Sequence, residues 1–424
     1  MTALIARLPA LWNSPSPLAL RRWLPVLGPG YVVAVGYIDP GNWATDVAAG
    51  ARYGFALLFV VLAASLAAAF LQVLALRLTL ATGKDLARLI RERLPRPLAL
   101  VCWAAAEVAM VATDVAELLG AAVALKLLFG LPIAAGVVLA AGATLTLLSL
   151  PHARGRLPEY VVGLLLTVIA GCFAYELSLA HPPLGALARG FLPDPQILHD
   201  PQMLYLSIGI IGATIMPHNL YLHSGLAKAR AAELGHLTPR AVLRFLSLDS
   251  WTMLGLACLA NAAIVVVAAM AFQRGAVAGA GLEDAYHLLD PVFGSGAGAV
   301  FAIGLLAAGI SATTTAGMAG QIVIEGFFDL RMPIALRALI TRGAALGPAL
   351  LLPLAMGEGG VDRLLVLSQV VLGLALPFVL VPMLMLLADR RLMRRAPVRG
   401  RTLAVAGSLA MVLILLNLWL VGTA

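Results

Sequence analysis

Long apolar runs dominate the pattern of this chain, and short polar loops separate them. A membrane-spanning helix needs about 20 mostly apolar residues, so each run predicts one such helix. The eighth run is long enough to include a short re-entrant or interfacial piece. The pattern predicts an all-α integral membrane protein with eleven spans, at about residues 24–50, 55–80, 98–126, 131–150, 159–180, 203–227, 245–272, 291–325, 334–355, 362–388 and 402–422.

Composition agrees with this pattern. Hydrophobic residues make up 61% of the 424 residues and charged residues only 12%, whereas soluble domains carry about 25% charged residues. The composition excludes a soluble enzyme, a disordered chain and a nucleic-acid-binding module. Although the net charge is +8, the basic residues lie in short loops, where they set orientation rather than bind nucleic acid.

The loop charges predict the orientation of the chain. With a cytoplasmic N-terminus, 22 Lys and Arg residues fall in cytoplasmic loops and five fall on the opposite side: Arg52, Lys126, Arg189, Arg274 and Arg363. This asymmetry matches the positive-inside rule. We expect a multi-pass protein of a bacterial inner membrane, with its N-terminus inside and, after eleven spans, its C-terminus outside.

The first run is interrupted by polar residues and proline. Asp39-Pro40-Gly41-Asn42 lies in the middle of the predicted span. Proline removes a backbone donor and glycine tolerates non-helical geometry, so the helix should unwind there. The carboxylate of Asp39 and the amide of Asn42 would then lie beside free backbone carbonyls, which is an oxygen-rich cation site. A helix-capping role is the alternative for Asp39.

The sixth run carries a second interruption. Pro217 again breaks the helix, Met216 offers a thioether and the carbonyl of Ala213 should be exposed. The two breaks are five spans apart, in helices of opposite direction, which is typical of inverted-repeat transporters with a midplane site. We expect a single polytopic domain, 1–424, with repeat one at about 24–180, repeat two at about 203–388 and an extra helix at about 402–422.

These two motifs resemble the signature motifs of the Nramp family of divalent metal transporters. The similarity runs from about residue 25 to the end and includes the loop 81–84 and the segment 112–117. The resemblance implies a LeuT-like fold and proton-coupled uptake of Mn²⁺, Fe²⁺ and related ions such as Co²⁺ and Cd²⁺. It also favours Gln369 of the tenth span as a further metal ligand, although a structural glutamine is an equal alternative from the sequence alone.

The ligand chemistry points to a transition metal independently. Asp39 and Asn42 supply oxygen and Met216 supplies sulfur. Mg²⁺ and Ca²⁺ prefer oxygen shells, whereas softer divalent ions accept sulfur. Met216 is therefore predicted to discriminate against the alkaline-earth ions; the alternative is a methionine that fills a gap in the core.

A candidate proton route lies beside this site. Three acids of the third span share one helical face, His218 adjoins the second break, and two arginines lie in the ninth span. We expect a relay from Asp39 that includes Glu107, Asp114, Glu117, His218, Arg337 and Arg342. The resemblance supports such a network, although Ala338 stands where some relatives have a second arginine. A structural lattice of ion pairs is the alternative.

The remaining alternatives differ in class. A sodium- or proton-coupled amino-acid carrier could share the architecture, and a passive channel could share the apolar spans. An intramembrane metal-dependent enzyme would need a ligand cluster with a positioned base, and no such motif is present. We therefore expect no enzyme activity, no permanently bound cofactor, and metal ions, protons and membrane lipid as the partners.

Overall fold

The computed structural model describes residues 30–149, 157–275, 280–331, 333–357, 359–394 and 396–423. Every regular element in these ranges is helical. The elements are α4 Gly30–Gly36, α5 Pro40–Tyr53, α6 Leu58–Thr82, α7 Leu86–Arg93, α8 Arg96–Phe129, α9 Ile133–Ser149, α10 Leu157–Ala180, α11 Leu184–Gly190, η2 Pro195–Leu198, α12 Pro201–Thr214, α13 Pro217–Glu233, α14 Pro239–Arg274, α15 Leu282–Phe293, α16 Ala297–Phe328, α17 Ile334–Met356, α18 Gly360–Ala375, α19 Pro377–Ala388 and α20 Gly400–Thr423.

The predicted apolar runs correspond to these helices. Nine helical segments in the described ranges are long and apolar enough to cross a membrane. The other two predicted runs fall short: the first is divided into α4 and α5, and the fourth is the 17-residue α9. The helical class is confirmed, whereas the count of eleven spans and the division into two repeats stay predictions. The charges predicted to be cytoplasmic before residue 30, at 151–156 and at Arg395 lie outside the described residues.

Two runs differ in detail from their prediction. The eighth run is divided, since α15 ends at Phe293 and α16 begins at Ala297. The tenth run, expected as one helix, is interrupted between Ala375 and Pro377, and the proline has no amide hydrogen to donate. Asn417 of α20 donates to the carbonyl of Gly373 at 2.8 Å, so one carbonyl near this interruption receives a side-chain donor.

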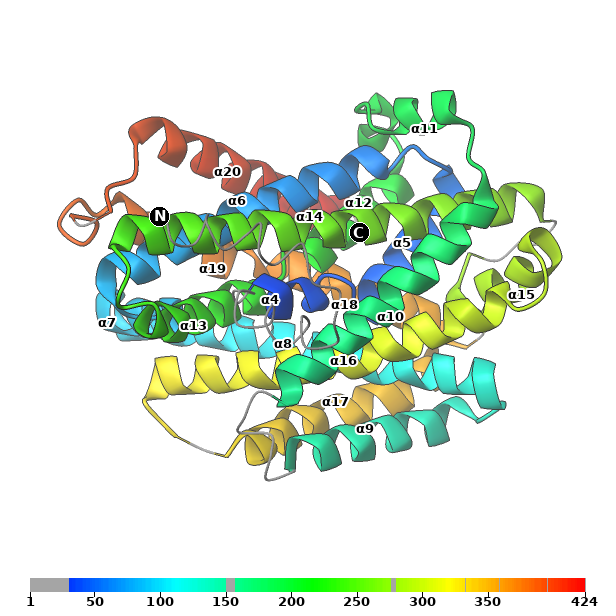
Figure 1. The fold of residues 1–424 in the computed structure, drawn as a ribbon, viewed down its shortest axis with the longest axis horizontal. Helices are drawn as coiled ribbons and strands as arrows, with labels where there is room; N and C mark the ends of the chain where they lie inside the picture. The colour runs from blue at the N-terminus through cyan, green and yellow to red at the C-terminus, as the bar shows by residue number, and fades with distance from the viewer. Residues whose placement is uncertain are drawn as a thin grey trace, which may run out of the picture.

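Close helix packing surrounds the two breaks. The bundle places α4, α5, α12 and α18 among the other helices, with α9 and α17 at one edge and α20 toward the other (Figure 1). A Cβ on Gly120 of α8 would lie 2.0 Å from Pro40, and one on Gly212 of α12 would lie 2.1 Å from the carbonyl oxygen of Gln369. Glycine at these positions allows backbones to approach closely, as in other membrane helices.

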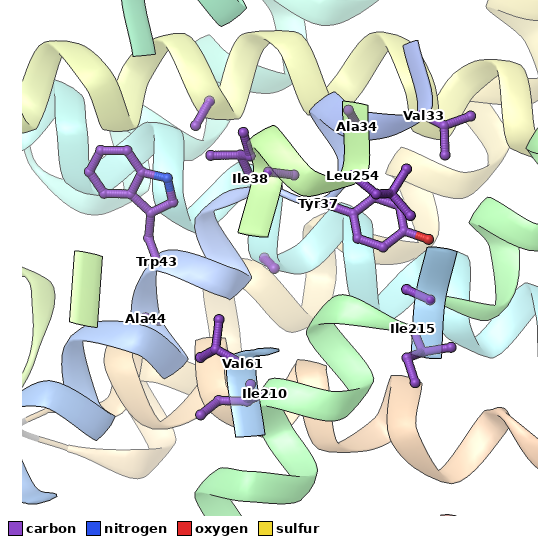
Figure 2. Close-up of a cluster of buried hydrophobic side chains, with 14 of the residues drawn as sticks. Val33, Ala34, Tyr37, Ile38, Trp43, Ala44, Val61, Ile210, Ile215 and Leu254 are labelled. Atoms are coloured by element: carbon purple, nitrogen blue, oxygen red, sulfur yellow. The ribbon is translucent and has the colours of Figure 1, made fainter. Parts of the chain in front are cut away.

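The apolar packing around the first break is continuous. Figure 2 shows Tyr37, Ile38 and Trp43 of the broken helix among side chains from α6, α12 and α14, including Val61 and Ile210. These five side chains are at most 2% exposed. The polar groups of the break are therefore held within a packed interior rather than against lipid.

A candidate metal site between two broken helices

The first break is a short non-helical segment between α4 and α5, and a side chain caps the N-terminus of α5. The amides of Tyr37 and Ile38 donate to Ala34 and Val35, which closes α4 with tight turns. Asn261 of α14 donates to the carbonyl of Tyr37 at 2.9 Å. This bond satisfies a carbonyl at the break, and the sequence does not identify its donor.

Asp39 caps the N-terminus of α5 and faces the interior. Its Oδ1 accepts hydrogen bonds from the backbone amide of Asn42 at 2.8 Å and from Asn42 Nδ2 at 2.9 Å. The residue is 1% exposed, and its Oδ2 has no partner among the described residues. Asp39 is thus the helix cap that the sequence allowed as an alternative, and one oxygen also remains available to a ligand.

The second break places a backbone carbonyl opposite this carboxylate. The helix α12 ends at Thr214, Met216 is extended and Pro217 begins α13. The carbonyl oxygen of Ala213 accepts a hydrogen bond from Asn42 Nδ2 at 3.1 Å. The Asn42 amide therefore bridges Asp39 and Ala213, which come from the two breaks.

This bridge brings candidate oxygen ligands from the two breaks close to one point. A single donor atom, Asn42 Nδ2, lies within 3.1 Å of oxygens of Asp39 and Ala213. Rotation of the amide by half a turn exchanges Nδ2 with Oδ1. Such a rotation would bring a third oxygen toward the other two, so that a cation could take the place of the hydrogen-bond donor.

Met216 lies at the start of α13 and is 1% exposed. Asn219 Nδ2 approaches its sulfur at 3.3 Å, and the thioether packs with Ala109 of α8 and Leu372 of α18. Met216 and Ala213 belong to the same break and are three positions apart in the sequence. Asn219, which follows the Pro-His pair of the second motif, is a neighbour that the sequence reasoning did not assign.

Gln369 of α18 packs against the first turn of α5. A Cβ on Gly41 would lie 1.8 Å from Gln369 Nε2, so only glycine leaves room for this contact. Gln369 Nε2 donates to Ser368 Oγ at 3.0 Å, while its Oε1 is buried without a partner among the described residues. An unpartnered amide oxygen beside the break fits either predicted role, a ligand or a structural contact.

Five of the predicted proton groups form two sets of ion pairs between α8 and α17. Arg337 pairs with Glu107, which also accepts from Trp103 Nε1 at 2.9 Å. The other cluster joins the buried Arg342 to Asp114 Oδ1 at 3.4 Å and to Glu117 Oε2 at 2.9 Å. His218 is buried, and its Nδ1 has no partner among the described residues, so no hydrogen bond from that atom links it to the acids.

A cavity of about 620 Å³ approaches the site from the side of Arg52 and Arg363, which the loop charges predict to be external. Its lining includes Ala44, two residues after Asn42, and Val366, one turn before Gln369. Within the described ranges, no three His, Cys, Asp or Glu side chains form a metal cluster. The candidate ligands are instead one carboxylate, amide and backbone oxygens, and a thioether.

Two interrupted helices that meet around buried polar groups define a secondary transporter of the LeuT-like fold. The protein MhsT, solved in complex with L-phenylalanine, superposes with a TM-score of 0.61 over 92% of this chain and 98% of its own, at 18% identity. At that identity the likeness shows the fold alone.

The chain belongs to the Nramp family, because the family described as natural resistance-associated macrophage protein-like matches residues 30–423. It is 44% identical to the divalent metal cation transporter MntH of Mesorhizobium japonicum, over 94% of this chain and 88% of the relative. It is 46% identical to MntH of Xanthomonas campestris, over 94% and 90%. The manganese transporter of Eremococcus coleocola, solved with an aromatic bis-isothiourea compound, superposes with a TM-score of 0.83 at 34% identity, over 96% of this chain and 87% of that one.

Proposed function

We propose that this protein imports divalent transition-metal ions, such as Mn²⁺ and Fe²⁺, by proton-coupled alternating access. The observation that carries the proposal is the Asn42 amide between Asp39 Oδ1 and the Ala213 carbonyl. The relatives are named as divalent metal cation or manganese transporters, and none of the names given above describes an enzyme.

The metal would bind between the two breaks. Asp39, Asn42 and the Ala213 carbonyl supply oxygen, Met216 supplies sulfur, and Gln369 supplies an amide oxygen in at least one conformation. Sulfur in this set favours softer divalent ions over Mg²⁺ and Ca²⁺. The cavity beside Arg52 and Arg363, on the side that the loop charges predict to be external, would lead the ion toward the site, and residues of α5, α12 and α18 line it.

Protons would leave by a separate route. A dication beside Asp39 disfavours a proton on that carboxylate. We assign the released proton to His218 and then to Asp114 and Glu117, with Arg342 nearby. The pairing of Arg342 with both acids supports this route, because a proton on either acid changes the balance of charge around one guanidinium.

The test is Mn²⁺ uptake into proteoliposomes under an imposed pH gradient, in competition with Mg²⁺ and Ca²⁺. We expect uptake against a Mn²⁺ gradient, accompanied by proton entry, and little competition from the alkaline-earth ions. Asp39→Asn keeps a capping oxygen but removes the charge, and it should abolish uptake. Asp194→Asn is the matched control, because Asp194 caps the exposed helix η2 by the same kind of bond.

Three outcomes would contradict the proposal. Uptake that only runs down the metal gradient would indicate a channel. Transport of an amino acid, with no Mn²⁺ uptake, would indicate a carrier of another substrate class. Full Mn²⁺ uptake by Asp39→Asn would remove the carboxylate from the site.

A further inference from the structure

A buried carboxyl group lies away from both the metal site and the ion pairs. Glu176 of α10 is 0% exposed, and neither of its carboxylate oxygens has a hydrogen-bond partner among the described residues. Charged groups inside a membrane protein are normally paired or face water. Glu176 is neither paired nor exposed, so its burial needs a physical explanation.

The walls around Glu176 are apolar. They enclose a cavity of about 10 Å³, roughly the probe volume needed for one water molecule. Five helices supply the walls: α5, α10, α14, α15 and α16. Apart from Glu176, the lining side chains are Val47, Phe173, Ile264, Val267, Ala268, Ala271, Ala285, Leu289 and Phe301.

No charged group of the described residues faces this carboxyl group from those helices. On α10, the buried Cys172 thiol lies one turn earlier. On α5, Asp46 precedes Val47 but does not line the cavity, and α14 and α16 line it only with apolar side chains.

The helix α15 carries five titratable side chains near its two lining residues, and they do not line this cavity. Glu283 pairs with Lys126, and Asp290 accepts from the amide of Gly298. Asp284 accepts from the amide of Gly281, and the ring of His287 packs against Tyr286. A carboxylate ion at Glu176 would therefore be desolvated without compensation, whereas a neutral acid would not carry that penalty.

We propose that Glu176 is a proton-binding site, which holds a proton while Val47 of α5 closes its cavity and releases it to water when α5 moves away. The O–H bond breaks, the proton passes to water, and the carboxylate that remains is stabilised by hydration. This site is separate from the route through Asp114 and Glu117. The binding of the proton does not depend on the proposed function, but any consequence for transport does.

An aromatic layer connects this site with the metal site. Trp43, the residue after Asn42, contacts the rings of Phe173 and Phe301 with centroid separations of 4.8 and 5.0 Å. Both phenylalanines also line the Glu176 cavity. Figure 2 shows the Trp43 ring projecting from α5. A shift of α5 therefore moves Trp43 and the Val47 wall together, which gives the Glu176 proton a way to respond to events at Asn42.

The direct test is infrared spectroscopy of the full-length protein in lipid nanodiscs, as a difference between acidic and alkaline buffer. We expect a carbonyl band of a protonated carboxyl group that is lost in both Glu176→Gln and Glu176→Met. Methionine has a similar length and suits the apolar walls, so Glu176→Met still provides the test if the glutamine variant does not fold. Glu233→Gln is the matched control, since Glu233 is 59% exposed and pairs with Arg230, and it should keep the band.

A second measurement is the pH dependence of Mn²⁺ uptake. If the Glu176 proton is released when α5 moves, Glu176→Gln and Glu176→Met should shift the pH midpoint of uptake, whereas Glu233→Gln should not. Equal spectra and equal pH midpoints in parent and both Glu176 variants would overturn the proposal. Absence of Mn²⁺ uptake in the parent, with the infrared band still lost in the variants, would refute the proposed function and leave the proton site standing.

Discussion

The side chain of Asn42 donates a hydrogen bond to the carbonyl oxygen of Ala213, 171 positions away in sequence, at 3.1 Å. The same nitrogen donates to Asp39 Oδ1 at 2.9 Å. One amide therefore ties the two broken helices together, with its donor atom at the point between two oxygens. A cation at this point would replace that donor, so the ligand-free bridge and the proposed metal-bound site use the same atoms.

Removing the bridge should weaken metal binding. For Asn42→Ala we expect a loss of Mn²⁺ affinity of roughly 10- to 100-fold, the range seen when a group that binds or orients a metal ligand is removed. Isothermal titration calorimetry in detergent measures it. Asn417→Ala is the matched control, because Asn417 also joins two helices by donating to a carbonyl, that of Gly373. Equal affinity in the parent and Asn42→Ala would exclude Asn42 as a ligand.

The thioether should act on selectivity more than on transport itself. Met216→Ala leaves the oxygen ligands in place, so we expect Ca²⁺ to gain on Mn²⁺ by about tenfold, or about 1.4 kcal/mol. Competition of Ca²⁺ with Mn²⁺ uptake in proteoliposomes measures this ratio. Met385→Ala, at a position 57% exposed on α19, should leave it unchanged. If Met216→Ala rejects Ca²⁺ as well as the parent does, Met216 is a packing residue only.

Gly41 should not tolerate a side chain. A Cβ there would meet Gln369 Nε2 at 1.8 Å, so Gly41→Ala must displace Gln369 or shift α5. We expect a loss of stability of about 1–3 kcal/mol, typical of overpacking, together with loss of Mn²⁺ uptake. Thermal unfolding followed by size-exclusion chromatography, together with uptake, tests both effects. The same substitution at Gly255 of α14 meets no atom within 4 Å and should be tolerated; normal uptake by Gly41→Ala would show that the contact is not needed.

The acid pair on α8 should separate proton movement from metal binding. Glu117→Gln removes a proton acceptor but leaves Asp114 paired with Arg342 at 3.4 Å. We expect proton entry to fall while the free energy of Mn²⁺ binding changes by no more than about 0.5 kcal/mol, because Glu117 is not a proposed ligand. A pH-sensitive dye inside proteoliposomes reports the proton, and calorimetry reports the metal. Weakened metal binding with undiminished proton entry would instead indicate the structural lattice.

The amino-acid sequence by itself determined the class of protein and the places where its helices break. Apolar runs need a membrane, and proline with glycine in the middle of a run prevents the helical bonds that would otherwise form. Asp39, Asn42 and Met216 could be singled out because polar and sulfur groups beside such breaks are costly unless they bind something. These are local properties, so they can be read from the order of residues.

Tertiary structure decided which partners these residues have. Three contacts join distant segments: the hydrogen bond from Asn42 to Ala213, the contact of Gln369 with Gly41 and the hydrogen bond from Asn261 to Tyr37. The sequence also does not show that Glu176 lies in an apolar cavity, because a glutamate near the end of an apolar run can face a headgroup, an arginine or a closed cavity. Only the packing of five helices decides among these surroundings, and packing depends on contacts between residues that are far apart in the chain.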